Sequence, residues 1–260
     1  MPDGTWGRPV DGTPSTHILK PEIAGYPNTV ENEVFCMRVA KHLGLQVAHV
    51  ETTEVAGRKL IVIERYDRLV HADGTVERIH QDGSCQATGT RPDDKYQLDD
   101  GPSLARIADI VAAVAVRGSL ERLLQTVTLN TLVGNGDAHA KNFSLLHERS
   151  GVLHLAPRYD AMCTLASDDD RLAMSVDDVR QTTRVTAQRL VREGASWGLP
   201  RQRCEEIVTG ILDRAPSAIE AARVETAGVP EPVVGAVAGQ LAQLRTASSL
   251  IERPPSDLHR

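Results

Sequence analysis

Cysteines are few in this chain, and none lies close to another in the sequence. The 260 residues include 4 cysteines, at positions 36, 85, 163 and 204. No Cys-x-x-Cys pair occurs, which excludes a disulfide framework and a cysteine zinc clip. His80 and Cys85 could form a metal pair, but two ligands without nearby partners do not make a site. We therefore expect reduced, mostly structural thiols, as in a cytoplasmic protein.

Long apolar runs and a surplus of basic residues are also absent. The most apolar window, residues 107–116, is short and is interrupted by Asp109, which predicts a buried helix and no membrane span. The first residues, from Met1 to Gly4, are polar and turn-like, unlike a signal peptide. A net charge of -6 argues against a general DNA binder that acts alone. These absences favour a cytoplasmic protein with no membrane partner.

The sequence pattern changes once along the chain, from mixed to mainly helical. Residues 1–66 show strand and helix patterns, residues 71–102 are rich in Gly, Asp and Gln and are typical of a loop, and residues from about 104 onward favour helices. Asn28 and Glu31 are spaced as a capping box, and Gly44 is a helix stop. The expected strands are 17–20, 46–52, 59–63, 143–146 and 152–155; the expected helices are 29–43, 119–132, 176–192, 201–222 and 229–251, before a loose tail from about 253.

Acidic and amide side chains surround the predicted hairpin of residues 143–155. Residues 134–144 form a loop just past the expected helix, and this loop contains Asp137 and Asn142. Antiparallel pairing of the two strands puts Asn142 opposite the residues just after 155. Asp160 follows a few residues later, so we expect it to lie near Asn142.

The order Asp-x-x-x-x-Asn, hairpin, Asp is the layout by which protein kinases hold a substrate hydroxyl and magnesium. Asp137 would accept the hydroxyl proton, while Asn142 and Asp160 would ligate Mg²⁺, which prefers oxygen ligands. The plainer interpretation is a polar turn and a surface acid. The helix, the hairpin and the second acid in sequence favour the catalytic interpretation.

Several charged residues near this loop have two open interpretations. His139 and Lys141 would either stabilise charge on the transferred phosphoryl group or fix the loop through hydrogen bonds. Arg149, Arg158 and Arg171 could guide an acidic substrate, but scattered arginines are usually solvated surface residues.

The first 66 residues contain a second set of candidates. Lys20 ends a strand and Glu33 lies on the following helix, which is the kinase arrangement that holds the phosphates of the nucleotide. Beyond the third strand, backbone groups of Glu64 and Tyr66 could contact adenine, although Tyr66 is equally explained as a core aromatic residue. The sequence thus predicts an α+β, protein-kinase-like bilobal fold, with a partial N-lobe in residues 1–66 and a larger, mainly helical C-lobe in residues 67–260.

Several blocks of residues, in order, resemble the HipA-type serine/threonine kinase toxins of type II toxin-antitoxin modules. The resemblance is dense from about residue 13 to 165 and compositional thereafter, apart from residues 172–174. The blocks are residues 15–21, 31–36 and 64–68, His80-Gln81, residues 85–87, Lys95-Tyr96, residues 135–144 and Tyr159-Asp160.

The resemblance implies ATP and Mg²⁺ as cofactors and assigns roles residue by residue. Lys20 would contact the phosphates, Glu64 and Tyr66 the adenine, Asp137 would be the base, and Asn142 and Asp160 would ligate magnesium. It also implies a HipB-like helix-turn-helix antitoxin as partner, with DNA bound only through that antitoxin. The implied substrate is a protein, a translation factor such as an aminoacyl-tRNA synthetase.

The sequence departs from this family at its start. Family members have an N-terminal subdomain and a small-residue loop with an autophosphorylated serine before the strand equivalent to residues 4–6. This chain begins at about that strand, and no glycine-rich loop precedes Lys20, so we expect a fragment, a misassigned start or a decayed member. We expect the 260-residue chain to bind Mg-ATP weakly and to show little or no kinase activity by itself. Two functions remain: a kinase toxin, and a truncated, non-catalytic relative that binds antitoxin or target. A metal-dependent hydrolase built on Asp137, His139 and Asp160 lacks further ligands.

Overall fold

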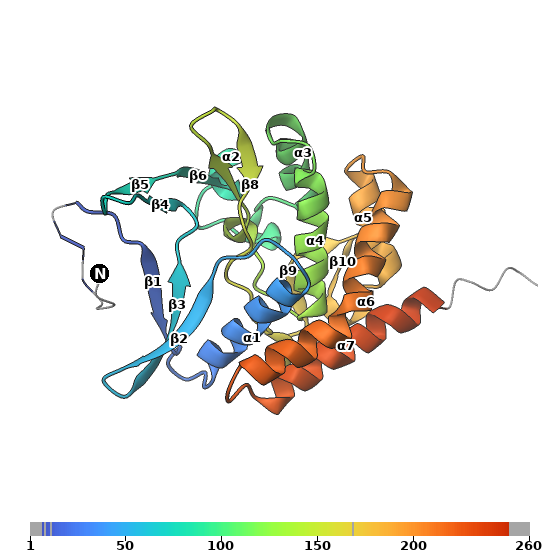
Figure 1. Cartoon of the computed structure of the whole chain (residues 1–260). Helices are drawn as coiled ribbons and strands as arrows, with labels where there is room; N and C mark the ends of the chain where they lie inside the picture. The colour runs from blue at the N-terminus through green and yellow to red at the C-terminus, as the bar shows by residue number, and fades with distance from the viewer. Residues whose placement is uncertain (1–6, 8, 11, 168, 250–260) are drawn as a thin grey trace, which may run out of the picture.

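The computed structural model describes residues 7, 9–10, 12–167 and 169–249, and the fold is α+β, as expected. Figure 1 shows a small antiparallel sheet on one side of the molecule and a group of helices on the other, with helix α1 between them. The sheet has the strand order β1-β3-β2. Its strands are β1 (His17–Pro21), β2 (Val50–Val55) and β3 (Arg58–Glu64), and the helix is α1 (Thr29–His42).

Helix α1 matches the expected helix, but its predicted capping box is wrong. Asn28 has a left-handed backbone (φ 62°), and its side chain makes no capping hydrogen bond. The backbone N–H of Asn28 instead donates to the carboxylate of Glu22. Glu31 is buried and accepts a hydrogen bond from Lys59, so tertiary pairing with strand β3 has replaced the local cap.

Residues 68–102, which include the predicted loop of residues 71–102, contain regular structure that the sequence did not predict. Two short hairpin strands, a third strand, a helical turn and a 3₁₀ turn lie in this region. They are β4 (Arg68–Val70), β5 (Val76–Arg78), β6 (His80–Gly83), α2 (Ser84–Ala87) and η1 (Gln97–Asp99). Strand β6 pairs with β7 (Ser144–His147), which is far away in sequence. It shows no apolar alternation of its own, so no local pattern marks it as a strand.

The predicted hairpin of residues 143–155 is confirmed. Strand β7 pairs with β8 (Leu153–Leu155), and β6 extends the pair to a three-stranded sheet of order β6-β7-β8. The 3₁₀ turn η2 (Ala140–Asn142) comes immediately before β7. This sheet therefore fixes the residues that follow the loop at 134–144.

Helices form most of the remaining chain. They are α3 (Leu104–Val114), α4 (Ser119–Leu132), α5 (Ala187–Ser196), α6 (Arg201–Glu225) and α7 (Glu231–Ser249). Helix α6 packs against α1, α4, α5 and α7 and so forms the centre of the core. The expected tail from residue 253 lies outside the described residues, and the lobe boundary after residue 66 stays a prediction.

The expected helix at residues 176–192 is wrong in its first half. Strand β9 (Arg171–Val176) pairs there with β10 (Val179–Gln181), and the helix begins only at Ala187. Asp177 and Asp178 join the strands with φ angles of 46° and 61°. Two consecutive left-handed residues are the mark of a tight type I′ hairpin turn, and aspartate tolerates this conformation. Thr186 then caps α5 by accepting a hydrogen bond from the N–H of Arg189 (3.2 Å).

No helix in the described part of the chain is long and apolar enough to cross a membrane.

Candidate active site

Helix α4 ends in a Schellman motif that directs the loop at residues 134–144 out of the helix. Gly134 has a φ of 66°, and the N–H of Asn135 donates to the carbonyl of Asn130 (2.8 Å). Gly136 lies in a crowded position, because a Cβ there would be 2.5 Å from the carbonyl oxygen of Arg171. The N–H of Gly136 donates to Oγ1 of Thr164 (2.8 Å). Both glycines are therefore required by the backbone path.

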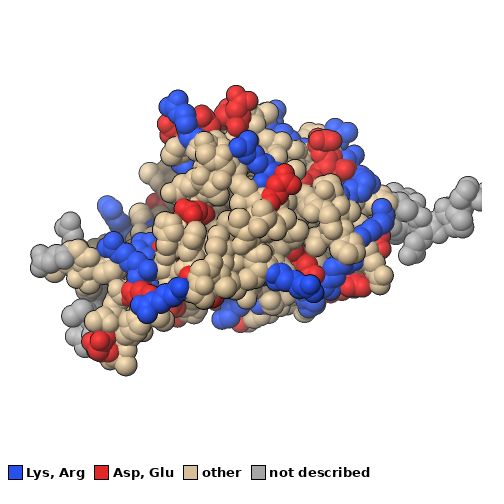
Figure 2. All heavy atoms as spheres, turned by 90° about the horizontal axis from the view of Figure 1, so that it is seen from above, with Lys and Arg blue, Asp and Glu red and all other residues tan. Residues whose placement is uncertain are grey.

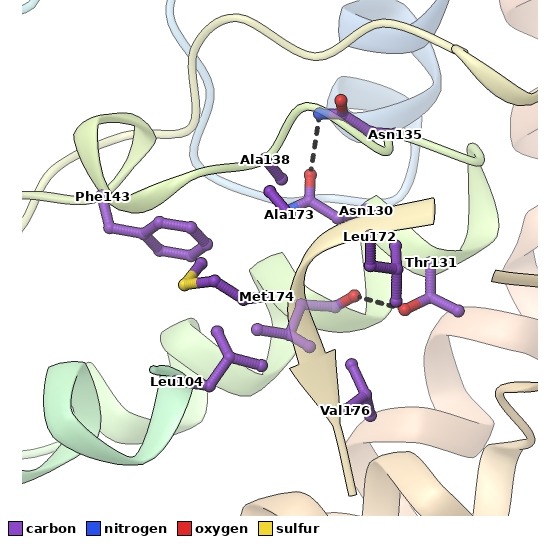
Figure 3. A pocket seen from close by; sticks show the side chains of 11 residues that line it. Leu104, Asn130, Thr131, Asn135, Ala138, Phe143, Leu172, Ala173, Met174 and Val176 are labelled. Atoms are coloured by element: carbon purple, nitrogen blue, oxygen red, sulfur yellow. Dashed lines mark hydrogen bonds between the residues drawn. The ribbon is translucent and has the colours of Figure 1, made fainter. Parts of the chain in front are cut away.

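A small cavity lies directly beneath this loop (Figure 3). Its volume is about 20 Å³, and its lining includes Leu104, Phe143 and Met174. Above it, the side chain of Asn135 donates to that of Asn130 (3.3 Å). A cavity of this size holds about one water molecule, whereas ligand pockets measure hundreds of cubic ångströms. It therefore reflects packing under the loop and is not a nucleotide site.

Asp137 lies at the surface of the loop and is held by Tyr96. The hydroxyl of Tyr96 donates to Oδ1 of Asp137 (2.7 Å). Burial and this hydrogen bond raise the pKa of Tyr96 to about 12, so the hydroxyl keeps its proton at neutral pH. The ammonium of Lys95 lies 4.8 Å from the centre of the Tyr96 ring. Lys95 and Tyr96 were part of the family resemblance, but no role was predicted for either.

Asn142 and Asp160 lie side by side, as the hairpin pattern predicted. The Nδ2 of Asn142 donates to Oδ2 of Asp160 (2.9 Å), and its Oδ1 accepts from the N–H of His139 (3.0 Å). A carbonyl oxygen has two lone pairs, so Oδ1 can accept one further ligand. Asp160 has a left-handed backbone (φ 58°), an uncommon conformation that often occurs at functional sites.

Lys20, at the end of the first sheet's strand β1, contacts both Asp160 and Glu33 of helix α1. Its Nζ lies 2.6 Å from Oδ1 of Asp160 and 3.0 Å from Oε1 of Glu33. Burial works to lower the pKa of Lys20, but the two carboxylates outweigh it and raise that pKa. Burial likewise works to raise the pKa of Asp160, but Lys20 and the hydrogen bonds hold it below its usual range. Burial raises the pKa of Glu33 despite Lys20.

Arg158 is buried next to the backbone of Asn142 and Asp160, so the expectation that it is a solvated surface residue is wrong. Its exposed fraction is 3%. Its guanidinium donates to the backbone carbonyls of Asn142 (3.3 Å) and Asp160 (2.9 Å), while Nε has no partner within the described residues. One side chain thus ties together the backbones that carry the two predicted metal ligands. Because these contacts are to backbone groups, no residue spacing in the sequence could reveal them.

The remaining predicted residues lie apart from this cluster or contact it only through the backbone. Tyr66 donates its hydroxyl to Gln81 (2.8 Å), and burial raises its pKa, so its side chain behaves as a core aromatic residue. The N–H of Glu64 donates to the carbonyl of His49 (2.9 Å), which leaves its carbonyl oxygen for any adenine contact. Lys141 is exposed, and its carbonyl accepts from the hydroxyl of Tyr159.

His139 is buried, with 7% of its surface exposed. Its ring meets the Tyr96 ring edge-on at 5.4 Å between centroids, and its Nδ1 has no partner among the residues described. Burial and Lys95 lower the pKa of His139 against the pull of Asp137. An imidazole whose pKa lies below its usual value is neutral at pH 7. A neutral ring is unsuited to stabilising phosphoryl charge, and the residue fixes the loop through its backbone hydrogen bond to Asn142 and its ring contact with Tyr96.

Comparison with known proteins identifies the family of this chain. The family model described as the HipA-like C-terminal domain matches residues 5–219. The chain belongs to the HipA-like C-terminal domain family. In this HipA-like domain, the matched region contains every predicted site residue.

Two curated relatives are named as kinases. The putative kinase Y4mE of Sinorhizobium fredii is 40% identical over 228 residues, which cover 84% of this chain and 52% of that protein. The serine/threonine-protein kinase toxin HipA of Shewanella oneidensis is 34% identical over 223 residues, which cover 79% of this chain and 50% of that protein. The HipA-like chain thus spans about half the length of these relatives.

Solved structures show the same fold. The Shewanella oneidensis HipA in a complex with HipB and operator DNA matches 89% of this chain and 57% of that chain, with a TM-score of 0.77 and 32% identity. The Helicobacter pylori proinflammatory kinase CtkA matches 88% of this chain and 86% of that chain, with a TM-score of 0.60. Its 12% identity supports a common fold only. The HipA-like domain therefore has a protein-kinase-like fold.

Proposed function

We propose that this chain is a HipA-like serine/threonine protein kinase toxin, which transfers the γ-phosphoryl group of ATP to a protein hydroxyl. The observation that carries this proposal is the contact of Lys20 with both Glu33 and Asp160. A strand lysine, a helix glutamate and the acid after the hairpin form the ion-pair arrangement on which kinases depend. Three distant parts of the chain meet in this contact, which a polar turn and a surface acid would not require.

The donor set of Asn142 and Asp160 fits Mg²⁺. Both residues offer oxygen, the element that magnesium prefers. The side chain of Asp160 is 45% exposed, so an ion can reach it. When bound, magnesium would neutralise charge on the phosphates and thereby stabilise the developing charge of the transfer.

Asp137 is the proposed base. Its carboxylate faces solvent, where a substrate hydroxyl can approach, and Tyr96 fixes its orientation through the hydrogen bond from its hydroxyl. Asp137 would accept the hydroxyl proton as the new oxygen–phosphorus bond forms. Lys20 would hold the phosphates, and the backbones of Glu64 and Tyr66 would meet the adenine. His139 would fix the loop, and the exposed Lys141 remains available to contact transferred phosphate or substrate.

The proposed partner is a HipB-like helix-turn-helix antitoxin, because the Shewanella oneidensis relative was solved with HipB and operator DNA. Figure 2 shows blue and red side chains interspersed around an uncharged centre, without a large basic area on the face seen. This favours DNA binding only through the antitoxin. A cytoplasmic protein of the translation machinery, such as an aminoacyl-tRNA synthetase, is the proposed substrate.

The experiment separates catalysis from binding. In a chain extended to the full length of its relatives, we expect Asp137→Asn to bind Mg-ATP like the wild type, measured by calorimetry. Radiolabelled phosphate transfer to a panel of purified synthetases should fall by about 10²-fold to 10⁴-fold. Asp160→Ala should lose magnesium-dependent ATP binding itself. Asp213→Asn, an exposed change on helix α6, is the matched control and should alter neither.

The outcome also decides between the two functions left open by the sequence. Wild-type binding of Mg-ATP without transfer to any protein would favour the non-catalytic relative. Transfer that survives Asp137→Asn would remove this residue from the mechanism.

A further inference from the structure

A second cluster of metal-ligand side chains lies on the sheet β6-β7-β8, apart from the proposed magnesium site. His80 and His147 are directly opposite each other in the antiparallel pair of β6 and β7. Asp82 is two residues beyond His80, and residues two apart on a strand share a face. The three side chains therefore project from one face of the sheet at neighbouring positions.

The distances show that the ligand atoms converge. The Nε2 of His147 lies 2.8 Å from Oδ2 of Asp82, and the Nε2 of His80 lies 3.4 Å from Oδ1 of the same carboxylate. One ligand atom from each residue lies within 4.8 Å of the others. Zinc–nitrogen bonds of about 2.0–2.1 Å put neighbouring ligands of a tetrahedral site about 3.3 Å apart. Small side-chain rotations bring the three atoms to such spacing.

Other histidines of the chain show that this convergence is more than ordinary pairing. His154 pairs with Glu148, and His71 pairs with Glu77, which also contacts Arg149; each of these carboxylates meets a single imidazole. At Asp82, a second imidazole approaches the same carboxylate. Within the described residues, His80, Asp82 and His147 are the only group of three histidine, cysteine or acidic residues close enough to share an ion. Cys85, which the sequence suggested as a partner for His80, is buried on helix α2 and is not part of the group.

We propose that His80, Asp82 and His147 form a binding site for a divalent transition metal, with Zn²⁺ the best match. Two imidazoles and a carboxylate are ligands that zinc and its neighbours prefer, and they differ from the oxygen pair proposed for magnesium. The side chain of His80 is 68% exposed, which leaves an open coordination position for water. The site does not depend on the proposed kinase function.

A metal at this position would link strands β6 and β7 near the proposed active site. The same strand pair continues to Gly83 and Ser144, and Ser144 is two residues beyond Asn142. The N–H and hydroxyl of Ser84 both donate to the carbonyl of Phe143 (2.8 and 2.9 Å). A bound ion would therefore hold together the sheet that anchors the end of the loop at 134–144.

The test is zinc titration of the whole 260-residue chain by calorimetry, with excess Mg²⁺ present to occupy the oxygen site. We expect one Zn²⁺ per chain, a rise in melting temperature on binding, and tetrahedral absorption bands when Co²⁺ replaces zinc. His147→Ala and His80→Ala should each weaken binding by at least about tenfold, since even the loss of groups that only support a ligand costs 10-fold to 100-fold. His154→Ala, which removes a half-buried histidine on the adjacent strand, should change nothing.

Circular dichroism must show that each variant is folded, because unfolding would expose the cysteines as zinc ligands. If zinc binding persists unchanged in the folded His80→Ala and His147→Ala variants, the proposal fails. Binding that disappears with Asp160→Ala but not with His147→Ala would place the zinc at the other site and would equally refute it.

Discussion

Two regions of this molecule differ in the kind of side chain that they bring together: one is apolar and the other is charged or polar. Helices α4 to α7 pack through apolar side chains that are fully buried, among them Leu124, Leu190 and Leu244, each 0% exposed. Where the first sheet meets the hairpin, the side chains are charged or polar, and they range from the buried Arg158 to the exposed Asp160. We call these residues the polar seam: Lys20, Glu33, Asn142, Arg158 and Asp160.

Apolar and charged side chains contribute differently to the stability of the fold. Burial of apolar surface stabilises a fold by roughly 25 cal/mol per Å², whereas buried ion pairs often gain nothing over apolar residues of the same volume. The helical region therefore supplies stability. The polar seam is retained at some cost in stability, and on the proposed function it holds metal ligands and phosphate contacts in place. Substitutions in the two regions should separate stability from nucleotide binding.

The largest expected effect on stability is in the helical region. Leu190→Ala removes a fully buried side chain from helix α5 and should lower the free energy of unfolding by about 2–5 kcal/mol in urea titrations. At temperatures where it remains folded, its affinity for Mg-ATP should match the wild type. Leu98→Ala, at a leucine that is 68% exposed, is the control and should be nearly neutral. A Leu190→Ala protein that stays stable but loses nucleotide binding would contradict the assignment of stability to the helical region and of nucleotide binding to the polar seam.

In the polar seam, Arg158→Met should show the reverse pattern. The change relieves the burial of a charge but leaves the carbonyls of Asn142 and Asp160 without a donor, so the net loss of stability should be below about 2 kcal/mol. Affinity for Mg-ATP should fall by about tenfold, roughly 1.4 kcal/mol, because the two ligand-bearing backbones are no longer tied together. Arg158→Lys keeps the charge and should retain part of the affinity. A loss of stability as large as that of Leu190→Ala would show that Arg158 is mainly structural.

Arg158 also shows how far the sequence could predict the site. The spacing of Asp137, Asn142 and Asp160 around a hairpin, and of Lys20 ahead of a helix, was enough to predict that Asn142 lies near Asp160 and Lys20 near Glu33. Those features depend on local elements and short turns. Arg158 acts through backbone carbonyls, and such contacts leave no pattern of residue types.

Fold predictions failed where distant or unusual contacts decided the structure. Strand β6 exists because β7 pairs with it from far along the chain. The turn at Asp177 and Asp178 replaced a predicted helix, because two left-handed residues close a hairpin there. The capping box failed because Glu31 found a partner on strand β3. For β6 and for Glu31 a contact between distant residues outweighed a local preference, and at Asp177 and Asp178 a left-handed turn did so.

A smaller effect is expected at the edge of the polar seam, where Tyr96 holds Asp137. Tyr96→Phe removes one hydrogen bond of 2.7 Å to a carboxylate and leaves the ring against His139. The rate of phosphate transfer should fall by about threefold to tenfold, while the KM for ATP and the melting temperature stay unchanged. In the same extended chain, Asp137→Asn is the reference for the largest loss of transfer. Equal losses in both variants would mean that Tyr96 takes part in the proton transfer itself.

The smallest expected effect concerns Asp177, which joins the β9–β10 turn to helix α5. Its carboxylate lies 2.6 Å from both Arg189 and Arg192, and hydrogen bonds from Arg192 lower its pKa. A group with a lowered pKa in the folded state stabilises the fold above its unfolded pKa of about 3.9, and this contribution is lost as the pH falls through the folded pKa. Asp177→Asn keeps a residue that tolerates the left-handed backbone, removes the negative charge and replaces one acceptor oxygen with an NH2 group.

At pH 7 this variant should melt less than about 3 °C below the wild type, because exposed ion pairs contribute little. The difference should shrink toward zero as the pH is lowered from about 5 to 2 in a series of thermal melts. A large difference at neutral pH, or one that grows on acidification, would show that the helical region depends on surface charge and not on its apolar core.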